Sequence, residues 1–216
     1  MTRPMDRAPA RALRRLTHTP TPPADMERCV RCGVTLPPEH RHLLERAYGA
    51  LACACDRCAR YYEGAGVAEG LYVTVPQRYQ YLRDFRLSDE QWDDLLIPVN
   101  MAFIFVKSAT QRPIAYYPSP AGATESLLTL ERWEALASEN PALASLAPDV
   151  EALLINRTRE ARDYYLAPID ACYQLVGIIR TRWRGLSGGD EVWKAVARFF
   201  ADLRARSVEV GGASDA

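Results

Sequence analysis

Five of the six cysteines fall into two groups whose spacing could hold a metal ion. The first group is Cys29-x-x-Cys32, and the second is Cys53-x-Cys55-x-x-Cys58. A C-x-x-C pair lets two sulfurs of one tight turn approach a shared ion, and two such pairs complete a tetrahedron. We therefore predict one metal site with the ligands Cys29, Cys32, Cys55 and Cys58.

The type of donor narrows the choice of metal. Thiolate sulfur suits Zn²⁺ and also suits iron. A structural Zn²⁺ site is the simplest interpretation. The alternative is a rubredoxin-like Fe centre for electron transfer, although Gly33 follows the first pair whereas Ala59 follows the second. A dithiol redox site is a third interpretation, because five thiols so close in sequence would permit exchange.

Two further cysteines are not assigned to this site. Cys53 could replace Cys55 as a ligand, because residues two apart in an extended segment point the same way. It could equally lie beside the site as an additional thiol. Cys172 sits in an apolar segment, where a cysteine behaves as a small buried hydrophobic residue.

Two histidines lie between the cysteine pairs. The segment 37–40 (Pro-Pro-Glu-His) predicts the start of a short helix, since proline fits a first helical turn. On such a helix His40 and His42 cannot share a face, so at most one would reach the ion. Surface or capping roles are favoured for both. The apolar side of this helix would be formed by Leu43, Leu44, Ala47 and Tyr48.

A glycine-rich segment precedes the last predicted helix. The segment 185–189 (Gly-Leu-Ser-Gly-Gly) could cradle a phosphate through backbone amides. However, Asp190 and Glu191 would repel an anion, and the lysine of a P-loop is missing. A helix N-cap, with the Ser187 hydroxyl bonded to the Asp190 amide, is the better interpretation.

The segment 118–126 contains two serines, a threonine and Glu125 in a predicted loop between a hairpin and a helix. Functional loops have this composition, and so do ordinary connections. Ser119 lacks a G-x-S-x-G context, and the histidines His18, His40 and His42 are far upstream, so a serine triad is not expected. No catalytic residue is predicted.

The sequence pattern around the candidate residues predicts an α+β protein made of a small module and a larger domain. We predict a disordered leader at 1–25, a Cys-rich metal-binding module at 26–64, an α+β domain at 65–206 and a disordered tail at 207–216. Gly64 and Gly66 would separate the module from the domain.

The larger domain should be an antiparallel sheet with two hairpin–helix units and a C-terminal amphipathic helix. Apolar periodicity and turn residues indicate its elements. They are strands at 71–75, 100–106, 114–117, 150–155 and 164–167, a capping box at 88–91, and helices near 130–137, 170–183 and 190–203. The run 100–106 is almost continuously apolar, as in a central strand covered on both faces.

Composition and charge exclude several classes of function. The net charge is zero, with Lys and Arg matched by Asp and Glu, so no nucleic-acid partner is expected. No stretch approaches the ~18 apolar residues of a membrane span. Arg14-Arg15 is not followed by an apolar segment, so export is not expected and we predict a cytoplasmic protein. Reduced cysteine pairs in that compartment usually bind metal.

Several motifs carry a resemblance to a known family. They are 29–33 (C-x-x-C-G), 39–44 (EHRHLL), 53–55 (CAC), 117–126 (YPSPAGATES) and 183–189 (WRGLSGG). Together they resemble an uncharacterised bacterial family often encoded beside high-affinity nickel–iron uptake hydrogenase genes, over residues 27–206. The resemblance implies an accessory part in assembling, stabilising or supplying electrons to a hydrogenase. It implies no catalytic residues.

The sequence thus predicts a non-enzymatic accessory or adaptor protein with a structural zinc site and a protein partner, such as hydrogenase subunits or maturation factors. The alternative is a redox or electron-transfer protein that uses the cysteines. A third possibility is an enzyme of unknown reaction with a pocket near the segment 118–126.

Overall fold

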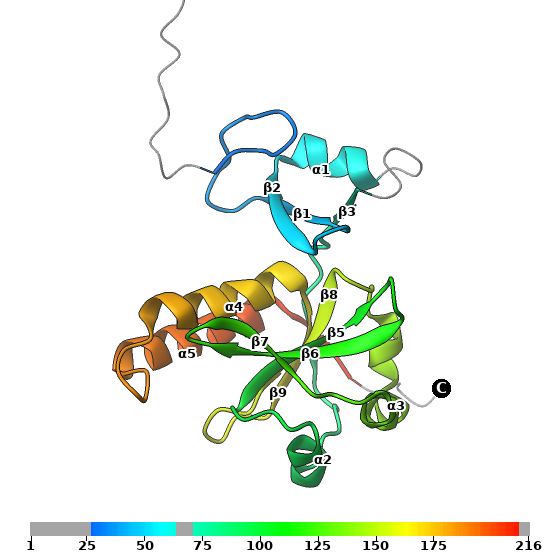
Figure 1. The fold of residues 1–216 in the computed structure, drawn as a ribbon, viewed down its shortest axis with the longest axis vertical. Coiled ribbons are helices and arrows are strands. Elements are labelled where there is room, and N and C mark those ends of the chain that lie inside the picture. Colours follow the sequence, from blue (N-terminus) through cyan, green and yellow to red (C-terminus); the bar gives the residue numbers. More distant parts are fainter. Residues whose placement is uncertain (1–26, 64–70, 212–216) are drawn as a thin grey trace, which may run out of the picture.

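In the computed structural model of the protein, a small N-terminal module packs against a larger α+β domain (Figure 1). The structure describes residues 27–63 and 71–211. The predicted leader, Gly64 and Gly66 and the last part of the predicted tail lie outside the described residues.

The module is built on a three-stranded antiparallel sheet. Its strands are β1 (Arg41–Glu45), β2 (Ala50–Ala54) and β3 (Tyr72–Thr74), in the order β2-β1-β3. Helix α1 (Asp56–Glu63) follows β2 and packs on one face of the sheet. The strand predicted at 71–75 is therefore confirmed as β3, and it joins the module's sheet.

The helix predicted after Pro37 is wrong, because this segment forms the β1–β2 hairpin. Gly49, with a φ of 63°, lies in the turn between the two strands. Leu43 is buried in the module core and Leu44 in the core of the larger domain, so the two faces of β1 are both covered. Adjacent leucines fit a doubly covered strand as well as a helix, and periodicity cannot separate the two.

The larger domain contains a seven-stranded sheet in the order β10-β4-β9-β8-β5-β6-β7. All neighbouring strands are antiparallel except β10 and β4, which are parallel. The strands are β4 (Gln80–Leu82), β5 (Met101–Lys107), β6 (Arg112–Ser119), β7 (Gly122–Ser126), β8 (Glu151–Asn156), β9 (Asp163–Pro168) and β10 (Val208–Val210).

Helices cover both faces of this sheet (Figure 1). Helices α4 (Ile169–Arg182) and α5 (Asp190–Arg206) pack on one face, and α2 (Asp89–Asp94) and α3 (Leu130–Glu139) pack on the other. A 3₁₀ turn (Pro141–Ser145) follows α3. Phe103 and Ile104 of β5 are fully buried on opposite faces, as a central, doubly covered strand requires.

The mixed α+β class with antiparallel sheets is confirmed, and five α-helices are present among the described residues. The predicted hairpins are β5–β6 and β8–β9. The capping box is also confirmed, since the Gln91 amide donates to Ser88 Oγ (3.1 Å) and the Ser88 amide donates to Gln91 Oε1 (2.9 Å). The apolar stripe of α5 is core, with Val196 and Leu203 buried.

Three local predictions differ from the structure. The segment 118–126 is a hairpin, because β7 pairs with β6 after a turn at Pro120-Ala121. The N-cap of α5 is Gly189, which caps without a side chain, so Ser187 does not play the predicted role. The start of the predicted tail forms β10, since its backbone pairs with β4 at a sheet edge.

Gly188 supports a first testable prediction. Its φ is 88°, and an added Cβ would lie 2.8 Å from Val192 Cγ1. Gly188→Ala should therefore destabilise the protein by about 2 kcal/mol in chemical denaturation, through backbone strain and overlap. Gly185→Ala is the matched control, because Gly185 also has a positive φ but has open space around it. Equal losses in the two variants would contradict the role of the close contact.

Candidate functional site

The four predicted ligands lie close together at one end of the module. Two of them come from the loop before β1, and two come from the start of α1. Cys29 and Cys32 lie in a tight turn, in which the Gly33 amide donates to the Cys29 carbonyl (2.9 Å) and Gly33 adopts a φ of 71°. Cys55 directly precedes α1, and Cys58 lies in its first turn. The Val30 amide donates to the Cys53 carbonyl (2.9 Å), so the turn is bonded to the end of β2.

The spacing of the sulfurs fits a four-coordinate metal. The Sγ atoms of Cys29, Cys32, Cys55 and Cys58 all lie within 4.8 Å of one another. The Cys32 and Cys55 sulfurs are 3.8 Å apart. A regular tetrahedron with metal–sulfur bonds of ~2.3 Å has edges of about 3.8 Å. The four-cysteine cluster could therefore bind a metal ion with little movement.

The surroundings of the sulfurs shift the pKa values of two of them in opposite directions. Burial opposes ionisation of Cys29, but hydrogen bonds from the backbone amides of Cys55, Cys32 and Arg31 lower its pKa. Burial, together with the neighbouring thiols, raises the pKa of Cys58. A metal ion would remove this conflict, because it stabilises all four thiolates at once.

Cys172 is separate from this cluster. It is fully buried in α4, where burial raises the pKa of its thiol. It packs in the core of the larger domain, in agreement with the predicted role as a small hydrophobic residue.

The structure also brings together three residues whose roles the sequence left open. One ring nitrogen each of His40 and His42 and the Cys53 sulfur lie within 4.8 Å of one another. Cys53 of β2 is the direct partner of His42 of β1, and His40 precedes β1 directly. The helix prediction separated the histidines. Two sequence signals pointed to a hairpin. They are the turn residue Gly49 and the alternation of alanine with a larger side chain in 50–54.

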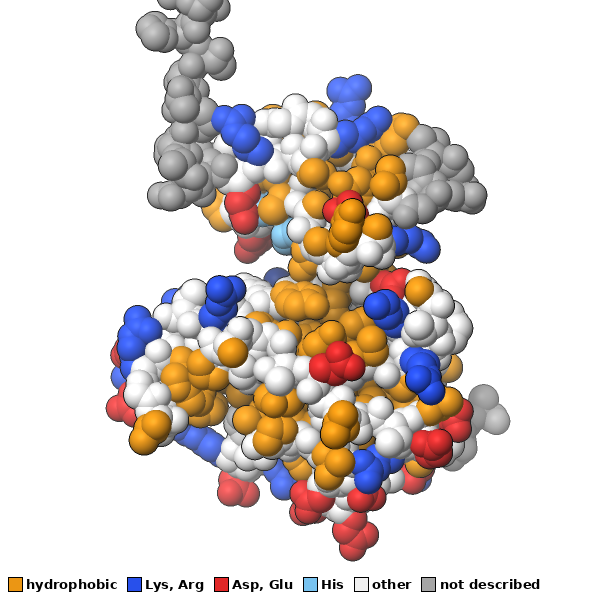
Figure 2. All heavy atoms as spheres, viewed as in Figure 1, with side chains coloured by type: hydrophobic (Ala, Val, Ile, Leu, Met, Phe, Trp, Pro, Cys, Tyr) orange, Lys and Arg blue, Asp and Glu red, His pale blue; other side chains and the backbone are white. Residues whose placement is uncertain are grey.

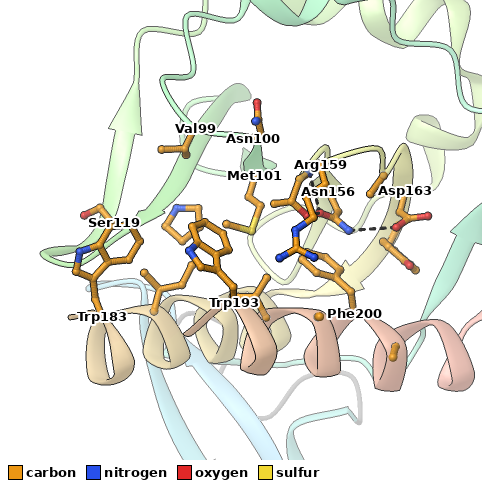
Figure 3. A pocket seen from close by; sticks show the side chains of 18 of the residues that line it. Val99, Asn100, Met101, Ser119, Asn156, Arg159, Asp163, Trp183, Trp193 and Phe200 are labelled. Atoms are coloured by element: carbon orange, nitrogen blue, oxygen red, sulfur yellow. Dashed lines mark hydrogen bonds between the residues drawn. The ribbon is translucent and has the colours of Figure 1, made fainter. Parts of the chain in front are cut away.

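A second candidate site is a pocket of about 960 Å³ in the larger domain. It lies between α5, the end of α4 and the ends of the central strands, and Figure 3 shows its side chains. Its apolar part is formed by Met101, Tyr165, Ile179, Trp183, Trp193, Val196 and Phe200. Pro118, Ser119 and Pro120 also line it, so a pocket does lie beside the segment 118–126.

The two tryptophans of the pocket are held by the glycine-rich connection between α4 and α5. Trp183 Nε1 donates to the Gly185 carbonyl (2.9 Å), and Trp193 Nε1 donates to the Ser187 carbonyl (3.0 Å). Their rings meet edge-to-face with centroids 6.1 Å apart. The segment 185–189 thus positions the wall of the pocket, a role that its sequence did not reveal.

The far end of the pocket is polar. Figure 3 shows Arg159, Asn156 and Asp163 grouped there, away from Trp183. Asn156 Nδ2 donates to Asp163 Oδ2 (3.1 Å), which holds both side chains in place. An apolar wall with polar groups at one end is the usual form of a small-molecule site.

The surface is mixed in charge. On the face shown in Figure 2, acidic and basic side chains are interspersed, and apolar side chains reach the surface in the module and at the waist below it. None of the described helices combines the length and the apolar composition that a membrane crossing requires.

Comparison with known proteins places the chain in a family but assigns no activity. No curated protein and no solved structure matches it. The model of one family matches residues 28–207, which include both the cysteine cluster and the pocket. The chain therefore belongs to this family, the family of unknown function DUF5947.

Proposed function

We propose that the protein is a non-enzymatic accessory protein whose four-cysteine cluster holds a structural Zn²⁺ ion and whose module binds a protein partner. The observation that carries this proposal is that the four cysteine sulfurs lie within 4.8 Å of one another. The residues are Cys29, Cys32, Cys55 and Cys58. The module core contains few apolar side chains, so a metal would supply much of its folding free energy.

The distribution of exposed apolar side chains supports a partner for the module. Among the described residues, half of the exposed large hydrophobic side chains lie in or next to this small part of the chain. They are Val30, Val34, Tyr48, Tyr61 and Leu71. So many exposed apolar side chains on so small a module favour a protein-binding surface there.

The motifs given above favour a partner in nickel–iron hydrogenase assembly or function, in the cytoplasm. A strain that lacks the gene should lose hydrogenase activity, and the wild-type gene should restore it. A gene for the Cys55→Ser variant should not. Unchanged hydrogenase activity in the deletion strain would overturn this part of the proposal.

Elemental analysis and the absorption spectrum of anaerobically purified protein test the metal. A colourless protein with bound zinc supports the structural site. Visible iron–thiolate bands would instead support the electron-transfer alternative, and metal-free thiols would support a dithiol site.

The pocket favours binding of a small, largely apolar molecule as a second candidate function. Trp183 and Trp193 line it, so a bound ligand should change the tryptophan fluorescence. Ala201→Trp, at the pocket lining on α5, should block this response to a panel of apolar ligands. Ala205→Trp, on the same helix and outside this pocket, is the control. No ligand-dependent change in the wild type would contradict this candidate.

A further inference from the structure

His40, His42 and Cys53 form a second cluster of metal-ligand type at the junction between the module and the larger domain. Their donor atoms lie within 4.8 Å of one another, and none of the three belongs to the four-cysteine cluster. His42 and Cys53 lie on the face of the β1–β2 hairpin that also carries Leu44, a member of the larger domain's core, and His40 directly precedes β1.

The hydrogen bonds of both imidazoles leave one nitrogen free to bind a metal. His40 Nδ1 lies 2.9 Å from the Pro37 carbonyl oxygen, which can only accept, so Nδ1 carries the proton. His42 Nδ1 lies 2.8 Å from Asp170 Oδ2, and a carboxylate likewise accepts. In each neutral ring the lone pair is then on Nε2. A carboxylate or carbonyl behind an imidazole is the usual support of a metal-bound histidine.

His40 provides an independent sign that a ligand is missing. Its side chain is only 4% exposed, and its buried Nε2 has no hydrogen-bond partner in the described part of the chain. Glu27 Oε2 lies 3.4 Å away, but the geometry is not that of a hydrogen bond. A buried ring nitrogen without a partner is costly unless something binds it.

Glu27 lies beside the cluster without belonging to it. Its carboxylate oxygen lies 3.4 Å from His40 Nε2, and its side chain is 61% exposed. Two imidazoles and one thiolate suit a divalent first-row cation such as Zn²⁺ or Ni²⁺. They do not suit Mg²⁺ or Ca²⁺, which prefer oxygen ligands.

We propose that His40, His42 and Cys53 bind a second divalent transition-metal ion, with Glu27 beside His40. Asp170, in the first turn of α4, is the positioning residue that orients His42. This inference stands on different ligands from the four-cysteine site, so either site can fail without the other.

Zinc stoichiometry of the reduced full-length chain tests the proposal. Metal-free protein is loaded with Zn²⁺, desalted and analysed for zinc per chain. We expect two ions in the wild type, and one in His40→Ala, in Cys53→Ala and in Cys55→Ser. His40→Gln is a second variant in case His40→Ala does not fold, and far-UV circular dichroism checks each chain.

The possible results separate the two sites. One ion in the wild type that is lost in Cys55→Ser but kept in His40→Ala overturns the second site alone. One ion lost only in His40→Ala and Cys53→Ala overturns the four-cysteine site alone. No bound zinc in the wild type overturns both.

Asp170→Asn tests the positioning role. It should weaken zinc binding at the second site about 10- to 100-fold in chelator competition, and it should leave the first site unchanged. Asp190→Asn is the matched control, because Asp190 occupies the first turn of α5 and is not part of the cluster. Equal affinity in Asp170→Asn and the wild type would contradict the assigned role.

Discussion

Replacing Cys55 with serine should remove one bound metal ion per chain and loosen the module. The module core has six buried members, and two of these, Cys29 and Cys58, are proposed ligands. So small a core stabilises little by burial alone, and binding energy at a structural metal site is also folding energy. We expect zinc analysis to show the loss, and limited proteolysis to cleave within 27–63 where the wild type resists.

Cys172→Ala is the matched control for this variant. Cys172 is a buried thiol in α4 that contributes to neither cluster, so metal content and protease resistance of the module should stay as in the wild type. Cys32→Ser should behave like Cys55→Ser. Full metal content in both of these serine variants would refute the ligand assignment.

Replacing Glu151 with alanine should cost about 2–3 kcal/mol of unfolding free energy, because it removes charge-assisted hydrogen bonds from a buried carboxylate whose partner Arg78 is 40% exposed. Glu151 is 1% exposed, and Arg78 donates to both of its oxygens, at 2.9 Å and 2.5 Å. The Ala147 amide also donates to it (2.9 Å). The hydrogen bonds and the charge of Glu151 raise the pKa of Arg78, although partial burial of Arg78 acts in the opposite direction. Urea denaturation measures the loss.

Asp202→Ala provides the comparison for this variant. Asp202 pairs with Arg198 at 3.8 Å on the exposed surface of α5, where such pairs contribute at most about 0.5 kcal/mol. Arg78 lies in the connection between β3 and β4, so Glu151 anchors the chain where it leaves the module. A loss below about 1 kcal/mol in Glu151→Ala would show that this anchor is unimportant.

Local sequence signals predicted much of the larger domain. The helical period of Val192, Val196 and Phe199 identified α5, and the apolar run before Lys107 identified a doubly covered strand. These signals are strong because one pattern dominates over several turns or residues. The cysteine spacing predicted the four-sulfur cluster for the same reason, since each pair is close in the chain.

The histidine cluster and the pocket depend on contacts between distant residues. Cys53 meets His42 only through the register of β1 and β2, and Asp170 reaches His42 across more than a hundred residues. Leu43 and Leu44 suited either a helix or a strand, and the choice was decided by the larger domain that covers one of them. The pocket combines Met101 with Trp193, which no local pattern relates.

The module and the larger domain share one hydrophobic core. This sharing should affect how the protein unfolds and whether its two parts can be exchanged separately between proteins. Leu44 of the module's sheet and Val75, which follows β3, are buried in the same cluster as α4 and α5. A chain cut before β4 would expose this apolar surface, so in the metal-bound wild type the two parts should unfold in one cooperative transition. The family match extends across both parts, as expected for segments that cannot be exchanged independently.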